Sequence, residues 1–191
     1  GSLADSTLYS GCIINKDYVL HSEEGYDEIV LVNTGLEEEK SEDNVQVQID
    51  VKSFQSYKAS GKNTLIDKAK HLVEALPNGG VVFTRDAVND FVCAHLKKHD
   101  IMVVRRVPES ALRSLSRATG AMIYQTPDEV VESTHAGVVR EKRNDVWYLF
   151  VQNDYDSKEA TLILRGATSH TLDEVERGFD DALGVVSLVL K

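Results

Sequence analysis

The sequence predicts an α/β fold in which helices alternate with the strands of a parallel sheet. Two observations predict it. Short runs rich in valine and isoleucine recur along the chain, and stretches with apolar residues at helical spacing lie between them over residues 64–124. A helix that connects two successive strands brings those strands into one sheet in parallel orientation. We therefore expect sheet layers flanked by helices.

Six segments have the composition of β-strands. Each is dominated by apolar, β-branched or aromatic side chains, either continuously or in alternation with polar ones. In chain order they are residues 29–33, 45–49, 80–83, 101–104, 147–151 and 161–164. The segments at 80–83 and 101–104 lie inside the helix–strand alternation, which predicts that they are parallel.

Three helices are predicted between residues 64 and 120. The first has an apolar stripe from Leu65 to Leu76 and is closed by Pro77 and the glycines that follow it. The third begins near Ser110, a residue suited to the N-cap, and stops at Gly120 in the C′ position. Between them, the second covers about residues 86–98.

This second helix has two different faces. On a helical wheel, the apolar face that we expect to pack on the sheet consists of Val88, Phe91, Val92 and Leu96. The opposite face is a mixed polar strip of Asp86, Asn89, Asp90, Cys93 and Lys97. Such a strip is most often a solvated surface, and a weak recognition surface is the alternative.

A longer amphipathic helix is predicted near the end of the chain. Thr171 and Glu174 have the spacing of a capping box. The apolar residues that follow the cap share one face: Leu172, Val175, Phe179, Leu183, Val186 and Leu190. An apolar face of this length needs a packing partner.

Composition excludes several classes of protein. The 191 residues carry a formal net charge of −10, which argues against a nucleic-acid or anionic-membrane binder. The longest mostly apolar stretch, at 182–190, is far shorter than the roughly 20 residues that span a bilayer. Cys12 and Cys93 fit no metal-ligand spacing or disulfide framework, so a reduced, cytoplasmic chain is expected.

The Gly1-Ser2 start resembles a tag scar, and residues 1–10 are expected to be this scar and a leading segment.

The sequence contains little catalytic chemistry of its own. It has no HExxH, nucleophile elbow, P-loop or GxGxxG motif. His95 and His99, four residues apart on one helix, are the only pair with metal-like spacing, and no third ligand accompanies them, so we expect no metal site. The neighbouring carboxylates of Asp180 and Asp181 point about 100° apart on a helix, which favours two solvated acids over a shared site.

Specific motifs run through these predicted elements. Residues 80–90 read GVVFTRDAVND, residues 101–107 read IMVVRRV, and residues 117–121 read RATGA. Residues 161–177 read TLILRGATSHTLDEVER, followed by DDAL at 180–183. In order and spacing these stretches resemble the apical domain of the group II chaperonins, the family of the archaeal thermosome and eukaryotic CCT. The resemblance covers about residues 11–190, with a shorter, acidic connection at His21 and an abbreviated segment at 126–136.

This resemblance implies a domain organisation. Residues 11–165 correspond to the apical domain, with the helical protrusion that serves as a lid at about residues 42–62. Residues 166–191 correspond to the start of the return segment into the intermediate domain, which contains the C-terminal amphipathic helix. Gly11 and Gly166 fall at the hinges. Gly61 lies inside the protrusion, where glycine costs a helix about 1 kcal/mol relative to alanine.

The resemblance also implies a function. It is that of a client-binding and lid-forming module from a double-ring, ATP-dependent folding machine, whose partners are non-native proteins and other chaperonin subunits. Asn89, Asp90, Cys93 and Lys97 are then the residues expected to face the client. Asp181 falls where the family's ATP-hydrolysis aspartate stands, with ATP and Mg²⁺ as cofactors of the full-length subunit only. The chain itself is expected to bind no cofactor and to be catalytically silent.

Two other hypotheses belong to different classes. One is a stand-alone small α/β enzyme that uses Asp181 or the pair of His95 and His99. The other is an interaction scaffold that shares only the fold, because fold alone does not determine function. ATP hydrolysis by the intact subunit but not by this chain distinguishes the chaperonin hypothesis from the enzyme.

Overall fold

The computed structural model describes residues 2–20, 25–37, 64–143, 145–153 and 157–190. The chain divides into two compact units, each described separately below. Unit 1 consists of residues 1–10 and 160–191, and unit 2 of residues 11–159. The predicted strand at 45–49 and the predicted protrusion at about 42–62 lie outside the described residues.

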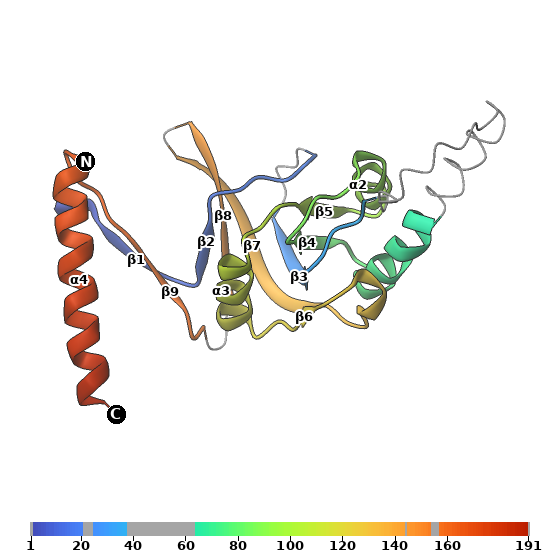
Figure 1. Ribbon diagram of the computed structural model, residues 1–191. Helices are drawn as coiled ribbons and strands as arrows, with labels where there is room; N and C mark the ends of the chain where they lie inside the picture. Colours follow the sequence, from blue (N-terminus) through green and yellow to red (C-terminus); the bar gives the residue numbers. More distant parts are fainter. Residues whose placement is uncertain (1, 21–24, 38–63, 144, 154–156, 191) are drawn as a thin grey trace, which may run out of the picture. The chain divides into compact units, whose positions relative to one another are not determined.

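Unit 2 is built on a seven-stranded mixed sheet (Figure 1). Its strands in spatial order are β2 (Cys12–Ile14), β8 (Val146–Gln152), β7 (Thr134–Arg143), β3 (Tyr26–Val32), β4 (Gly80–Thr84) and β5 (Ile101–Val104), and β6 (Ile123–Tyr124) also pairs with β3. Strands β3, β4, β5 and β6 are parallel, whereas β2, β8 and β7 are joined to one another and to β3 in antiparallel fashion. The predicted parallel layer is therefore confirmed, and an antiparallel hairpin extends it.

Two apolar cores lie on the two faces of this sheet. Alternate residues of a strand point to opposite faces, and in β4 Val81 and Phe83 belong to one core while Val82 belongs to the other. The helix α3 (Glu109–Thr119) contributes Leu112 and Leu115 to the first core. The helix over residues 64–75 and α2 (Asp90–Lys97) cover the second. The expected helix–sheet–helix layering is thus present.

The free edge of β5 is partly covered by a loop. The amide N–H of Val19, in the segment between β2 and β3, donates to the carbonyl oxygen of Val103 at 2.9 Å. The preceding residue, Tyr18, is buried in the first core next to Tyr26, with their ring centroids 6.0 Å apart. Covering an edge strand in this way removes a template for pairing with other chains.

Unit 1 contains a two-stranded antiparallel ribbon and a long helix. Strand β1 (Thr7–Ser10) pairs with β9 (Ala160–Ile163), after the short 3-10 turn η1 (Leu3–Asp5). The helix α4 (Ser169–Val189) has most of its apolar residues exposed, among them Phe179, Leu183 and Val186. None of the helices within the described ranges combines the length and apolarity needed to cross a bilayer.

Helix boundaries differ from the predictions at two N-termini. The N-cap of α4 is Thr168, whose hydroxyl accepts from the amide of Thr171, so the predicted capping box at Thr171 is wrong. Likewise α3 begins at Glu109 after Pro108, and Ser110 lies inside its first turn. The predicted stop at Gly120 is confirmed by its left-handed backbone, with φ of 77°. Strands β1, β2, β6 and β7 were not predicted.

Candidate functional site

The start of α2 is fixed by a side-chain cap and by an arginine. The Asn89 side chain accepts a hydrogen bond from the amide of Phe91 at 2.9 Å, which satisfies one of the free N–H groups at the helix start. Arg105, just after β5, donates to the Asp90 carboxylate at 2.8 Å and to the Val88 carbonyl at 3.2 Å. These contacts attach the first turn of α2 to the end of the neighbouring strand.

The predicted orientation of α2 is wrong at two positions. Cys93, expected on the outer face, is only 2% exposed and belongs to the second core. Phe91, expected to face the sheet, is 43% exposed. The helix begins only at Asp90, and Val88 lies before it in an extended bridge with Leu36. Because Val88 is not on the helix, including it in the helical wheel rotated the inferred inner face toward Phe91.

The observed outer face of α2 is mixed in chemistry. Its exposed side chains are Asp90, Phe91, Ala94 and Lys97, followed by Lys98 at the C-cap. Asn89, as the N-cap, is half-buried at one end of this face. We call Asp90, Phe91, Ala94, Lys97 and Lys98 the α2 face. It combines one aromatic ring with a carboxylate and two ammonium groups, a composition suited to binding a polypeptide by weak contacts and unsuited to covalent chemistry.

The two cysteines are buried, free thiols. Cys12 belongs to the first core and Cys93 to the second. Burial raises the pKa of each thiol to about 11. Since the thiolate is the reactive form, neither is a nucleophile at neutral pH, and Cys93 cannot contact a client at the surface.

The histidine pair lies at the end of α2. The rings of His95 and His99 are 5.3 Å apart between centroids. Burial, and then the nearby His99, lower the pKa of His95. Within the ranges that the structure describes, no three His, Cys, Asp or Glu side chains gather as a metal site would require. The geometry of this pair therefore adds nothing to the enzyme hypothesis.

Comparison with known proteins decides the family. A sequence model of the TCP-1/cpn60 chaperonin family matches residues 1–191. This chain belongs to the TCP-1/cpn60 chaperonin family. A thermosome subunit of Methanopyrus kandleri is 33% identical over 199 residues, and thermosome subunit alpha of Halobacterium salinarum is 34% identical over 202 residues. All of this chain is covered in both alignments, against 36% and 35% of those relatives, so the chain spans about a third of their length.

A solved structure supports the same assignment. The open-state monomer of a group II chaperonin from Methanococcoides burtonii superposes with a TM-score of 0.75 at 26% sequence identity. The match covers 97% of this chain and 41% of that one. The fold predicted from the motifs, a chaperonin-like α/β arrangement, is therefore confirmed.

The remaining predicted residues of this chaperonin chain lie in unit 1 or at the division between the units. Asp181 is exposed on α4, as is Asp180. Gly11 is the first residue of unit 2 and has a φ of 135°, which side chains rarely adopt. Gly166 lies inside unit 1, six residues after the division at Ala160, and a Cβ there would come within 2.9 Å of the Leu172 side chain. The role of these residues as a catalytic group or as hinges stays a prediction.

Sequence reasoning missed a partly buried ion pair in unit 2. The Arg140 guanidinium of β7 donates to both carboxylate oxygens of Asp17, at 2.6 and 2.7 Å, and lies 3.4 Å from the centroid of the Trp147 ring. Asp17 and Arg140 are 123 positions apart, and neither lies in a recognisable motif. Only the alternation of β7 and β8 could have indicated that Arg140 and Trp147 share a face.

Proposed function

We propose that this chain is the client-binding and lid-forming apical part of an ATP-dependent group II chaperonin subunit, which assists the folding of non-native proteins. The observation that carries the proposal is the α2 face, an exposed aromatic and charged strip on a helix whose opposite side is locked into a core. Membership of the chaperonin family supplies the context in which such a face binds polypeptides.

The α2 face fits a weak and releasable contact. Phe91 offers a partly exposed ring that can cover an apolar side chain of an unfolded protein. Lys97 and Lys98 add positive charge, while the negative charge of Asp90 is paired with Arg105. The face therefore favours non-native segments that combine apolar and acidic residues. Asn89 contributes by capping the helix, and Asp90 by holding it to β5.

The rest of the proposal concerns the full-length subunit. ATP and Mg²⁺ are its cofactors, and its partners are non-native clients and the neighbouring subunits of a double ring in the cytoplasm. In that subunit the exposed Asp181 carboxylate would accept a proton from the attacking water, and Mg²⁺ would supply charge stabilisation of the phosphates. The sequence has no P-loop or GxGxxG motif, and we assign nucleotide binding to other segments of the subunit. Gly11 and Gly166 would serve as hinges.

The decisive experiment uses assembled rings of the full-length subunit. Phe91→Gln combined with Lys97→Glu changes the chemistry of the α2 face without touching a fully buried side chain. We expect captured denatured client to fall several-fold while ring assembly and ATP hydrolysis stay unchanged. The matched control is Val131→Gln, because Val131 is an apolar residue of unit 2 that is 78% exposed outside α2. Equal capture by the double variant and the control would reject the α2 face as the client site.

A second experiment addresses the nucleotide. In the full-length subunit, Asp181→Ala should abolish ATP turnover and leave nucleotide binding intact, because only water activation is lost. The 191-residue chain should neither hydrolyse ATP nor bind it with micromolar affinity. Normal turnover by the Asp181→Ala rings would remove Asp181 from the mechanism.

A further inference from the structure

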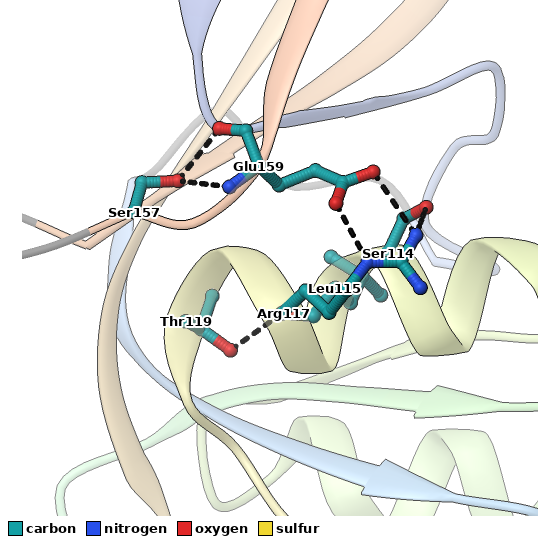
Figure 2. Close-up of polar contacts among 6 residues, drawn as sticks. All are labelled: Ser114, Leu115, Arg117, Thr119, Ser157 and Glu159. Carbon is teal, nitrogen blue, oxygen red and sulfur yellow. Dashed lines mark hydrogen bonds and ion pairs between the residues drawn. The ribbon is translucent and has the colours of Figure 1, made fainter. Parts of the chain in front are cut away.

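The last turns of α3 are fastened to the segment that ends unit 2. Figure 2 shows the Arg117 side chain of α3 reaching the Glu159 carboxylate. Its Nε donates to one carboxylate oxygen at 2.7 Å and a terminal nitrogen donates to the other at 3.2 Å. The Asn153 side chain donates to the Thr119 carbonyl at 3.0 Å. The stretch from 153 to 159 is therefore tied to the same helix end at both of its ends.

The backbone of Glu159 also binds the chain segment that enters unit 2 at Gly11. Its carbonyl oxygen accepts from the amide of Gly11 at 2.9 Å and from the Ser157 hydroxyl at 2.9 Å. Ser10 and Ala160, the next residues in each direction, are the first pair of the β1–β9 ribbon of unit 1. We call the Gly11–Glu159 hydrogen bond and its two residues the junction, because both chain segments leave unit 2 there.

We propose that the Arg117–Glu159 ion pair is a latch that keeps the junction closed, and that breaking the pair opens the junction while the rest of unit 2 stays folded. Whether the junction is open or closed then depends on a side chain of α3, that of Arg117. The inference does not depend on which molecule the chaperonin chain binds, since it rests only on contacts inside unit 2.

The latch residues are more exposed than the residues that anchor α3 in the core. Leu112 and Leu115 are fully buried in the first core, so α3 stays in place when its exposed contacts are lost. The side chains of the latch are partly exposed to water, Arg117 to 55% and Glu159 to 23%. Local opening of such a segment needs far less free energy than global unfolding. The hydrogen bond with Arg117 lowers the pKa of Glu159, so the pair is charged on both sides at neutral pH.

Backbone hydrogen exchange of the chain tests the latch directly. We expect Arg117→Gln to lower the protection of the Gly11 amide about two- to fivefold, the range that partly exposed ion pairs give. The amides of β5 should keep their protection. Arg113→Gln is the matched control, because it removes an arginine of the same helix that pairs with Glu109 at 2.6 Å but does not reach the junction. The reversed pair, Arg117→Glu with Glu159→Arg, should restore protection of Gly11.

The salt dependence of Gly11 protection provides a second readout. Because the latch is partly exposed, 1 M NaCl should lower Gly11 protection in the unmodified chain and have little effect in Glu159→Gln, where no attraction between opposite charges remains to screen. Unchanged Gly11 protection in Arg117→Gln would overturn the proposal. So would an equal loss in Arg113→Gln, or a loss that extends to the amides of β5, because both would show general destabilisation.

Discussion

The partly buried ion pair of Arg140 and Asp17 leads to a quantitative prediction about stability. The Arg140 side chain is 6% exposed. It donates two hydrogen bonds to the negatively charged carboxylate of Asp17. Asp17→Asn replaces the carboxylate beside Arg140 with a neutral amide. Removing one partner of a buried pair costs about 3–5 kcal/mol. Asp17 is one-third exposed and asparagine keeps one acceptor oxygen, so we expect a loss of about 2–3 kcal/mol.

Urea unfolding followed by tryptophan fluorescence measures this loss. Trp147 is the only tryptophan of the chain and stacks on Arg140, so its emission reports on the pair itself. The midpoint of thermal unfolding should fall by roughly 5–10 °C. Glu141→Gln is the control, because it breaks a more exposed pair with Arg143 in the same hairpin and should change stability by less than about 1 kcal/mol. If Asp17→Asn behaves like this control, the pair contributes nothing and the reasoning is wrong.

Three further predictions concern buried or partly buried titratable groups. Within the described part of the chain the Tyr18 hydroxyl is buried without a hydrogen-bond partner, so Tyr18→Phe should stabilise the protein by about 1 kcal/mol in urea unfolding, and a loss of stability would contradict this. Burial shifts the pKa of Cys12 and Cys93 from 9.0 to about 11, so a disulfide reagent at neutral pH should label the folded chain at least about 100-fold more slowly than the denatured chain. The pKa of Glu159 is lowered below 4.5, so its stabilising effect should be complete above pH 4.5 and disappear as the pH falls through the lowered value. A stability difference between the unmodified chain and Glu159→Gln that persists in strong acid would refute this.

Local sequence patterns predicted the parallel layer well. The residues of β4 and β5 are all buried, and a strand covered on both faces leaves a continuous apolar run in the sequence. Strand β7 was missed because it carries four charged side chains among its ten residues, and its place is fixed by pairing with β3 and β8. Pairing with distant strands leaves no signal in the strand itself.

The candidate site was predicted only in part. The motifs placed the helix that carries Asn89, Asp90 and Lys97 correctly in the sequence, but periodicity alone could not show where the helix begins. A start at Asp90 instead of before Val88 exchanges Phe91 and Cys93 between the two faces. The Arg117–Glu159 latch could not be predicted, because its two residues are 42 positions apart and meet only through the fold.

Direct binding of a permanently unfolded protein to the chain tests the central claim, that the α2 face captures non-native polypeptide. A fluorescently labelled, reduced and alkylated protein is titrated with the 191-residue chain, and anisotropy is recorded. We expect weak, saturable binding that Phe91→Gln with Lys97→Glu reduces several-fold and that Val131→Gln leaves unchanged. Binding that is identical in all three chains would contradict it, as would an absence of binding by the unmodified chain.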